Sequence, residues 1–334
     1  MINFSNGISA TYYAARVNPK TWTDAGEIPI ISGSITKNAT SDLVESADIT
    51  VNEDIGTEQW FRVYMVAEQS GTKERVPLFT GIASSPSRDI KGNREIHKLD
   101  CYSVLKVASD ILLPLGWFAP ARSNGGELIQ MLLSDLPCPV ELDEGSPTII
   151  SSFVAGNKDS KLSIAQEIAK AINWQIKVRG DGSVRICPKP STISGTFDNI
   201  ENDIVETSVT DKHDIFAVPN VLRVTLDGSA ATARDDDPDS EYSTVNRGRE
   251  VWSQEDAKLA AGETLGEYAV RRLKEMQNPS RTLSYTRRFQ PDVDVNDLVS
   301  IIYPKQSIGD VFRVKSQTIT LSHGAKVKEE VINE

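Results

Sequence analysis

The stretch Asp100-Cys101-Tyr102-Ser103-Val104-Leu105-Lys106 marks the point at which the hydrophobic pattern of the chain changes. Before it, apolar residues occupy every second position, as in Ala47-Asp48-Ile49-Thr50-Val51, which is the pattern of a half-buried strand. After it, the apolar residues of 104–111 follow helical spacing until Pro114 stops the segment. We therefore predict a small antiparallel sheet or barrel over residues 1–103, with a domain boundary at its end.

Strand-like alternation returns near the other end of the chain. The runs with this pattern are 61–65 and 77–82 in the first part, and 220–224, 311–314 and 318–321 in the last part. Gly71-Thr72 and Gly92-Asn93 lie between strand-like runs of the first part, where glycine is typical of a hairpin turn. Two β regions are thus predicted to enclose a domain of another kind.

Residues 104–202 carry the signals of this enclosed domain. A second helix is expected to begin near Ser123 and to end before Pro137. A third helix has Ser163 with Gln166 three residues later, which we interpret as a reciprocal pair that caps its N-terminus. These helices predict a small α/β domain inserted between the β regions.

A hairpin completes the inserted domain. Residues 175–179 and 183–187 read as strands, and Gly180-Asp181-Gly182 between them offers the positive φ that a tight turn needs. The overlapping Arg179-Gly180-Asp181 also matches a cell-adhesion signal. We interpret it as a turn, because the hairpin requires such residues on conformational grounds.

The second β region lies within residues 203–334 and contains one strongly signalled helix, about 264–277. Thr264 and Glu267 have the spacing of a capping box, and Asn278-Pro279 is a stop signal. The apolar side of the helix consists of Leu265, Tyr268, Ala269, Leu273 and Met276. We expect this side to dock on the second β domain.

Composition and charge exclude several function classes. Of the 334 residues, 39% are hydrophobic, and the net charge is −11, which disfavours a surface built to hold phosphate backbones or an anionic membrane. We find neither a secretory signal nor an apolar run of spanning length, so we expect assembly in the host cytoplasm and no stable membrane insertion. The three cysteines, Cys101, Cys138 and Cys187, are too widely spaced for a metal clip and are expected to be buried.

The acidic run around residue 237 begins like a calcium loop. Asp235, Asp237 and Asp239 have the spacing of the first three ligands. Ser240 stands where the loop needs glycine, and Asn246 stands where it needs a bidentate glutamate. We interpret this run as a solvated loop.

A second run, Asp292, Asp294 and Asn296, fails in the same way, with Asp297 and Tyr303 at the two diagnostic places. Its alternation with valines favours the polar face of an extended segment. No metal site and no cofactor are therefore predicted.

The sequence offers no catalytic constellation. His97, His213 and His323 are the only histidines, and none lies in a known mechanistic signature. His97 falls in a strand-like run and is assigned a surface or ladder role. The 47 acidic residues leave open a pair of glycosidase carboxylates, although no pair stands out. We predict no catalytic residue and no enzyme.

Aromatic residues at strand positions have two interpretations. Trp60, Phe61, Tyr64, Trp117 and Phe118 are candidates for a sugar or partner platform. Packing in the core and at sheet edges is the commoner use of such residues, and we favour it.

The order of these segments resembles the bacteriophage tail hub family, which includes the N-terminal hub region of tail-associated lysins. The segments that carry the resemblance are 77–82 with Asp89, 100–106, 126–187, Phe216 with Pro219-Asn220-Val221, 269–275, 283–285 and 297–299. The lysins continue past this region into fibre or peptidoglycan-cleaving domains, whereas this sequence stops at Glu334, so a lytic role is not expected.

The resemblance implies a mostly β, α+β protein with two tube-type β-barrel domains, 1–103 and 203–334, and a small α/β domain, 104–202, inserted between them. It implies a homotrimeric ring at the tail tip of a virion. The ring would close the tail tube and contact the distal tail protein, the tape measure protein and a tip or fibre protein. DNA would pass through without specific binding. Another virion β protein, such as a distal tail protein, and a glycan-binding or glycan-cleaving module are the alternatives.

Overall fold

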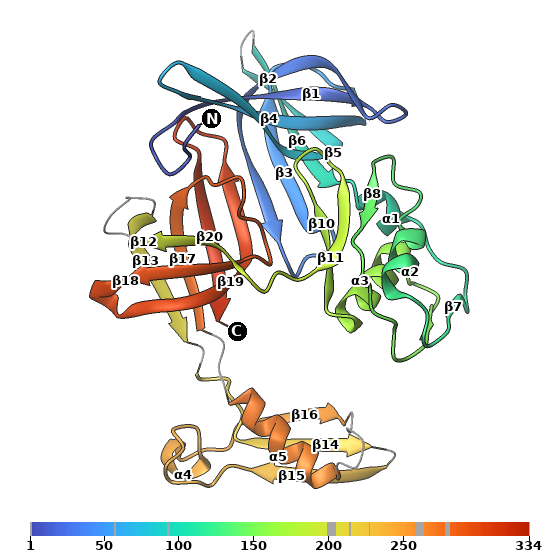
Figure 1. The fold of residues 1–334 in the computed structure, drawn as a ribbon, viewed down its shortest axis with the longest axis vertical. Helices are drawn as coiled ribbons and strands as arrows, with labels where there is room; N and C mark the ends of the chain where they lie inside the picture. Colours follow the sequence, from blue (N-terminus) through green and yellow to red (C-terminus); the bar gives the residue numbers. More distant parts are fainter. Residues whose placement is uncertain are drawn as a thin grey trace. The chain divides into compact units, whose positions relative to one another are not determined.

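The computed structural model describes residues 2–56, 58–91, 94–198, 205–213, 215–226, 228–257, 264–277 and 281–333. This part of the chain is mostly β with few helices, as the sequence predicts (Figure 1). It divides into two compact units, Met1–Val209 with Ser284–Val331, and Thr210–Leu283 with Ile332–Glu334. The division falls inside the predicted domain 203–334. The boundaries expected at 103 and 202 stay predictions.

The first six strands close on themselves. They are β1 (Ser9–Asn18), β2 (Thr23–Asn38), β3 (Glu45–Val51), β4 (Gln59–Gln69), β5 (Thr72–Lys91) and β6 (Arg94–Ser103). They pair antiparallel in the order β1-β4-β5-β6-β3-β2, and β2 pairs back to β1. Along β3 the predicted alternation is confirmed, since Ala47, Ile49 and Val51 are buried and Asp48 is exposed.

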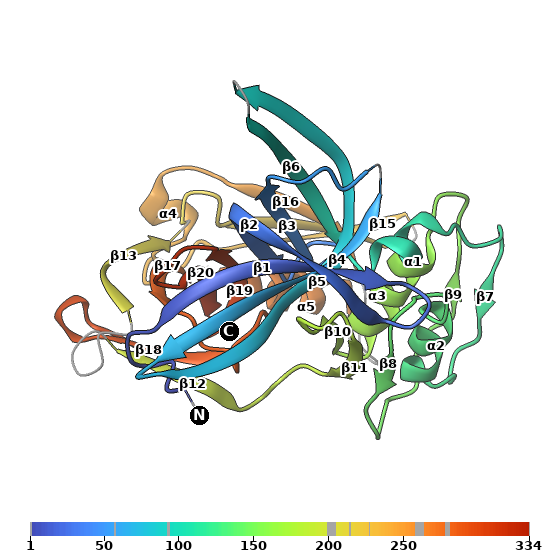
Figure 2. The same ribbon diagram turned by 90° about the horizontal axis from the view of Figure 1, so that it is seen from above.

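One of the two predicted glycine turns in this first group can be compared with the structure. Gly71 joins β4 to β5 with a φ of 83°, so the predicted hairpin is confirmed there. Gly92-Asn93, the second predicted turn, lies outside the described residues. Figure 2 shows the paired ends of β5 and β6 extending beyond the other strands of this group.

A second group of strands continues the same sheet from β2. It consists of β12 (Ile193–Asp198), β13 (Val205–His213), β17 (Arg281–Arg288), β18 (Leu298–Tyr303), β19 (Ile308–Thr320) and β20 (Lys326–Asn333), with a 3₁₀ turn η1 (Pro304–Gln306). The order is β2-β19-β20-β17-β13, and β18 pairs with both β19 and β12. Residues 311–314 and 318–320 therefore lie on one long strand, β19, rather than on two.

The inserted part combines short helices with a small sheet. Its elements are α1 (Lys106–Asp110), β7 (Phe118–Ala119), α2 (Gly125–Leu132), β8 (Val140–Leu142), β9 (Phe153–Val154), α3 (Lys161–Ala171), β10 (Trp174–Val178) and β11 (Val184–Pro188). β10 and β11 form the predicted antiparallel hairpin, and β8 joins β11 in parallel. Ile129 and Leu132 of α2 and Ile168 of α3 share one buried core with Val184 of β11.

The cap of α3 differs from the prediction. Ser160, not Ser163, is the N-cap, and its side chain accepts from the Ser163 amide while Ser163 Oγ accepts from the Ser160 amide. Gln166 lies one turn further along, where its side-chain amide donates to the Asp42 carbonyl. The prediction was wrong because the true capping box uses a serine at its second position, which the usual glutamate or glutamine pattern does not reveal.

The β10–β11 turn is docked against the first group of strands. Thr80 Oγ1 donates to the Gly180 carbonyl at 2.7 Å, and Arg62 donates to the Asp181 carbonyl at 2.9 Å. A Cβ on Gly180 would lie 2.0 Å from the Pro77 carbonyl oxygen, and Gly182 has a φ of 80°. The turn interpretation of Arg179-Gly180-Asp181 is confirmed, with the glycine required by close backbone approach.

The second unit has its own core. Strands β14 (Val221–Leu226), β15 (Ser229–Arg234) and β16 (Trp252–Asp256) form a three-stranded sheet, accompanied by α4 (Thr244–Arg247) and α5 (Leu265–Met276). The predicted capping box of α5 is confirmed, with Thr264 and Glu267 bonded reciprocally. Leu273 packs with Leu222 and Val224 of β14. The helix thus docks on this small sheet, which lies within residues 203–334.

Replacing Leu273 by Asp should destabilise the second unit by about 3 kcal/mol or more, because it places an unpaired charge in the α5 core. Val270→Asp is the matched control, since Val270 lies on the same helix and is 63% exposed. Chemical denaturation followed by circular dichroism measures both. An equal, small loss in the two variants would show that the Leu273 side of α5 is not a core face.

Replacing Gly180 by Ala should lower the stability of the first unit by about 1–3 kcal/mol, since the new methyl group must displace the Pro77 backbone. Gly7→Ala is the control, because a Cβ there meets nothing within 4 Å. Thermal melting compares the two. An unchanged melting temperature for Gly180→Ala would contradict the docked turn.

Candidate functional site

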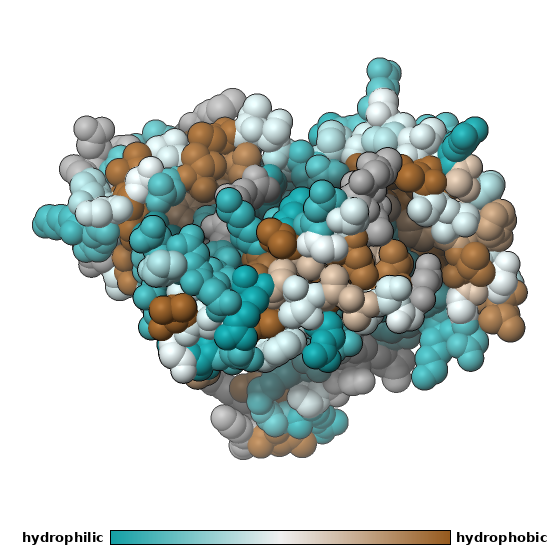
Figure 3. Space-filling model, turned by 90° about the horizontal axis from the view of Figure 1, so that it is seen from below, coloured by the Kyte–Doolittle hydropathy of each residue, from teal (hydrophilic) through white to brown (hydrophobic). Residues whose placement is uncertain are grey.

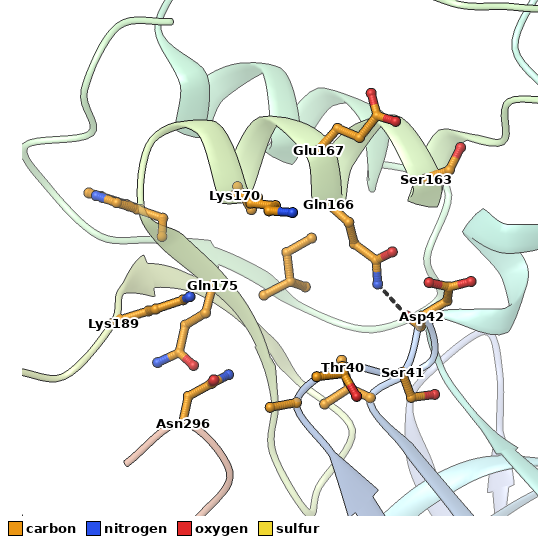
Figure 4. Close-up of a pocket in the computed structure, with 15 residues that line it drawn as sticks. Thr40, Ser41, Asp42, Ser163, Gln166, Glu167, Lys170, Gln175, Lys189 and Asn296 are labelled. Atoms are coloured by element: carbon orange, nitrogen blue, oxygen red, sulfur yellow. Dashed lines mark hydrogen bonds between the residues drawn. The ribbon is translucent and has the colours of Figure 1, made fainter. Parts of the chain in front are cut away.

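A groove in the first unit lies beside helix α3 (Figure 4). The β2–β3 turn, residues 39–44, forms one wall and α3 forms the other. Trp174 and Ile176 of β10 also line the hollow. Asn296 lies at one end of it. The hollow has a volume of about 550 Å³, within the usual range of ligand sites.

Local hydrogen bonds hold the β2–β3 turn in place. Asn38 Oδ1 accepts from the Thr40 amide at 2.9 Å and from Thr40 Oγ1 at 2.8 Å. The Ala39 amide donates to the Lys315 carbonyl at 2.9 Å, which ties the turn to β19. Gln166 of α3 donates to the Asp42 carbonyl across the groove. The two walls are therefore joined by a direct contact.

The base of the groove is apolar and its rim is charged. Ala169, Trp174 and Ile176 are buried among the lining residues. Lys170 and Lys189 line the hollow with Asp42 and Glu167, and none of the four forms an ion pair within the described part of the chain. The groove thus offers binding groups and an apolar floor, without a nucleophile and base in contact.

A buried ionic cluster, made of Lys37, Glu45, Lys177, Asp294 and Asp297, lies next to the groove. Lys37 Nζ is 3.1 Å from Asp294 Oδ2 and 3.8 Å from Glu45 Oε2, and Lys177 Nζ is 3.5 Å from Asp297 Oδ1. Asp297 Oδ2 also accepts from the Asp294 amide at 2.8 Å. The cluster joins β2, β3 and β10 to the turn that precedes β18.

Glu45 is the exceptional member of the cluster. Its side chain is 1% exposed, and neither carboxyl oxygen has a hydrogen-bond partner in the described structure. Burial, opposed by Lys37, raises the pKa of Glu45 to about 8. Burial also opposes ionisation of Asp294, but Lys37 and Lys177 outweigh it and lower the pKa of Asp294. At neutral pH Lys37 is therefore balanced by Asp294, while Glu45 keeps its proton.

The sequence interpretation of the second acidic run was wrong. Val293 and Val295 are buried and Asp292 is exposed, but residues 291–292 and 295–296 form turns, not an extended segment. Asp294 and Asp297 belong to the ionic cluster and do not form a solvent-facing polar face. Their burial is compensated by Lys37 and Lys177, which come from remote parts of the chain. No local signal reveals these partners.

In the first acidic run, the aspartate side chains accept hydrogen bonds from backbone amides of the same loop. Asp235 Oδ1 accepts from the Asp237 amide, and Asp237 Oδ1 accepts from the Asp239 amide. Asp235 Oδ2 accepts from Ser240 and Gln277 side chains. These carboxylates stabilise the loop, and among the described residues no cluster of histidine, cysteine and acidic groups is placed to hold a metal ion.

The histidines occupy separate places. His97 is buried on β6 opposite Val51, in the predicted ladder role. His323 Nε2 lies 3.3 Å from Ser9 Oγ on the surface, and the described contacts include no carboxylate that orients this ring. The side chain of His213 lies outside the described part. All three cysteines are buried, as expected.

The aromatic residues do not form one platform. Phe61 and Tyr64 are buried in the first group of strands, and Trp60 packs edge-on against Trp22 at 5.5 Å. Phe118 is 57% exposed, and it pairs with Val154 in the short β7–β9 ladder. On the face shown in Figure 3, apolar residues form separate patches among hydrophilic ones. No helix in the described part is long and apolar enough to cross a membrane.

Comparison with known proteins identifies the fold. No protein-family model and no curated protein matches the sequence. The tail protein of Neisseria meningitidis MC58 matches with a TM-score of 0.68 at 13% identity, over 98% of this chain and 97% of that one. The 43 kDa tail protein of prophage MuSo2 from Shewanella oneidensis matches with a TM-score of 0.67 at 12% identity, over 97% and 98%.

The chain has the fold of phage tail proteins. A chain of the Francisella PdpA–VgrG complex is also similar, with a TM-score of 0.59 at 9% identity, but only 58% of that chain is covered. The resemblance noted in the sequence is confirmed at the level of the fold. At these identities the comparison assigns no site residue.

The raised pKa of Glu45 predicts a pH-dependent stability of the tail-like fold. The folded state holds a proton that the unfolded state, with an ordinary pKa of 4.5, releases, so stability should fall as pH rises from about 5 to about 8. One proton corresponds to at most about 1.4 kcal/mol per pH unit. Glu45→Gln keeps the shape of the protonated acid and should flatten this slope.

Denaturant unfolding at several pH values measures the effect. Glu144→Gln is the control, because Glu144 is exposed and lies outside the cluster. If the slope of Glu45→Gln equals those of the wild type and the control, the proton is not held on Glu45.

Proposed function

We propose that this chain is a structural hub of a phage tail tip. It forms a trimeric ring that closes the tail tube and connects it to the distal tail protein, the tape measure protein and a tip or fibre protein. The observation that carries the proposal is the likeness to tail proteins along nearly the whole of both chains. A likeness limited to one small β region would fit many unrelated proteins, whereas this one spans both β regions and the insert.

The arrangement of strands supports a ring of three chains. Each chain contributes a closed group, β1–β6, and a second group, β12, β13 and β17–β20, joined through the β2–β19 pairing. We interpret the two groups as the two tube-type barrels. Three chains then supply six such domains, which match the six-fold symmetry of a tail tube.

The charge of the chain supports a conduit for DNA. With 47 acidic and 36 basic residues, a ring lined by carboxylates would repel phosphates and let the genome pass without sticking. Screening over a Debye length of about 8 Å keeps the repulsion between the carboxylates modest. We assign the protein to the virion tail tip, assembled in the host cytoplasm, and give it a non-enzymatic role.

Two alternatives differ in what they predict. A distal tail protein would have the symmetry of the tube and would be present in six or twelve copies per tail. A glycan-acting module would bind or cleave cell-wall sugar as an isolated protein. The full-length likeness to tail proteins favours the hub over the second alternative.

Cryo-electron microscopy of tails that contain this chain should show three copies at the tip, related by a three-fold axis. The same reconstruction should give a negative potential along the inner wall. Six or twelve copies would contradict the hub and favour a distal tail protein. Three copies with a neutral or positive channel would retain the hub and refute the conduit.

A further inference from the structure

Strand β15 forms an open edge of the small sheet in the second unit. The sheet has the order β15-β14-β16, so β15 has a neighbour on one side only (Figure 1). The Asp235 amide donates to the Asn220 carbonyl at 2.9 Å, and this bond fixes the alternation of the antiparallel β14–β15 ladder. Every second residue of β15 therefore bonds to β14, and the residues between direct their amides and carbonyls outward. These outward residues are Ala230, Thr232 and Arg234, all exposed.

The two edges of this sheet differ in how they are protected against pairing. Charged side chains, proline and bulges are the usual protection of an edge strand, and β16 ends with two acidic residues. From Ser229 to Ala233, β15 has only small uncharged side chains, and its register with β14 is regular. Arg234 at its end is already paired with Asp236 at 2.8 Å. The β15 edge is therefore the one that is open to a further strand.

Helix α5 covers one face of the sheet and turns a different flank toward each edge. On one flank, Tyr268 and Arg272 donate to Glu255 of β16 at 3.1 and 3.0 Å. On the other flank, Gln277 donates to Asp235, directly after β15, at 2.8 Å. The second flank thus lies on the β15 side.

An apolar residue is exposed on this β15 flank of α5. Val270 precedes Gln277 by two helical turns, so both lie on the same flank. Leu273 is buried against the sheet, whereas Val270 is 63% exposed. A helix is about 10 Å wide, which is about the spacing of two strands, and α5 packs on β14 and β15. A strand added beside β15 would turn every second side chain toward Val270.

We propose that the β15 edge binds an extended segment of a partner protein as an added strand. The outward main-chain groups of β15 pair with the segment, its alternate apolar side chains lie against Val270, and the polar side chains between them lie on the open face of the sheet. A second copy of β15 does not fit there, because two-fold antiparallel pairing puts both α5 helices on the same face and brings their Val270 flanks together. The site goes beyond the hub role and rests on the second unit alone.

The test uses the purified full chain and a fluorescein-labelled peptide in which Val and Thr alternate between terminal lysines, followed by fluorescence anisotropy. Thr232→Pro removes an outward amide, a change that an edge strand tolerates, and should weaken binding roughly tenfold. Thr232→Ala keeps the amide and is the matched control, which should bind like the wild type. Val270→Asp should also weaken binding, because it places a charge beside the apolar side of the added strand.

A second peptide keeps the test independent of the variants. It has the same sequence but is N-methylated at every second amide, on the edge that pairs with β15, and should not bind. Equal binding of the two peptides, or equal affinity of the wild type and Thr232→Pro, would overturn the proposal. So would equal loss in Thr232→Ala and Thr232→Pro, or no binding by the wild type at about 1 mM peptide.

Sedimentation velocity tests a second copy as the occupant. If wild-type chains associate and Thr232→Pro separates them, β15 is a contact between copies and the proposal is wrong. Thermal melting of each variant excludes loss of folding as the cause of weaker binding. The peptide assay does not depend on a three-fold ring, so its failure is distinct from failure of the hub role.

Discussion

A buried ionic cluster constrains how three parts of the first unit are arranged. Lys37 and Glu45 come from the closed group of strands, Lys177 comes from the inserted part, and Asp294 and Asp297 come from the turn before β18. Charges withdrawn from water are tolerated only when they compensate one another, so removing one member leaves the others uncompensated. The cluster therefore fixes three parts of the chain in one arrangement, and the groove beside α3 takes its shape from that arrangement.

Much of the fold follows from local pattern. The strand alternation of β3, the Gly71 turn, the β10–β11 hairpin and the capped helix α5 each depend on a few neighbouring residues, and the structure confirms them. The order of these segments was enough to suggest tail proteins, and the fold comparison agrees. What local pattern could not decide is which sheet a given element joins. Strand β19 shows this, because its alternation does not indicate that it pairs with β18 along its first half and with β2 along its second half.

The candidate site could not be predicted from local sequence patterns, because its residues come from distant parts of the chain. Lys37 and Asp294 are 257 residues apart, and nothing near Asp294 shows that its carboxylate is buried beside an ammonium group. The acidic spacing instead suggested a solvent-facing segment. In the sequence, Gln175 and Lys189 have the pattern of ordinary strand and loop residues. They line the same groove because α3 packs against the β2–β3 turn.

The second unit is built into the chain in a way that bears on how such proteins diversify. The chain leaves the large sheet through β13 and returns through β17, and these two strands are hydrogen-bonded neighbours. Neighbouring strands lie about 4.8 Å apart, the distance that an ordinary short loop closes. To keep the β13–β17 pairing, the segment between these two strands needs only to have its two ends close together. A segment of roughly 70 residues between these strands is therefore accommodated without a break in the pairing of the sheet, which makes this position one that tolerates insertion.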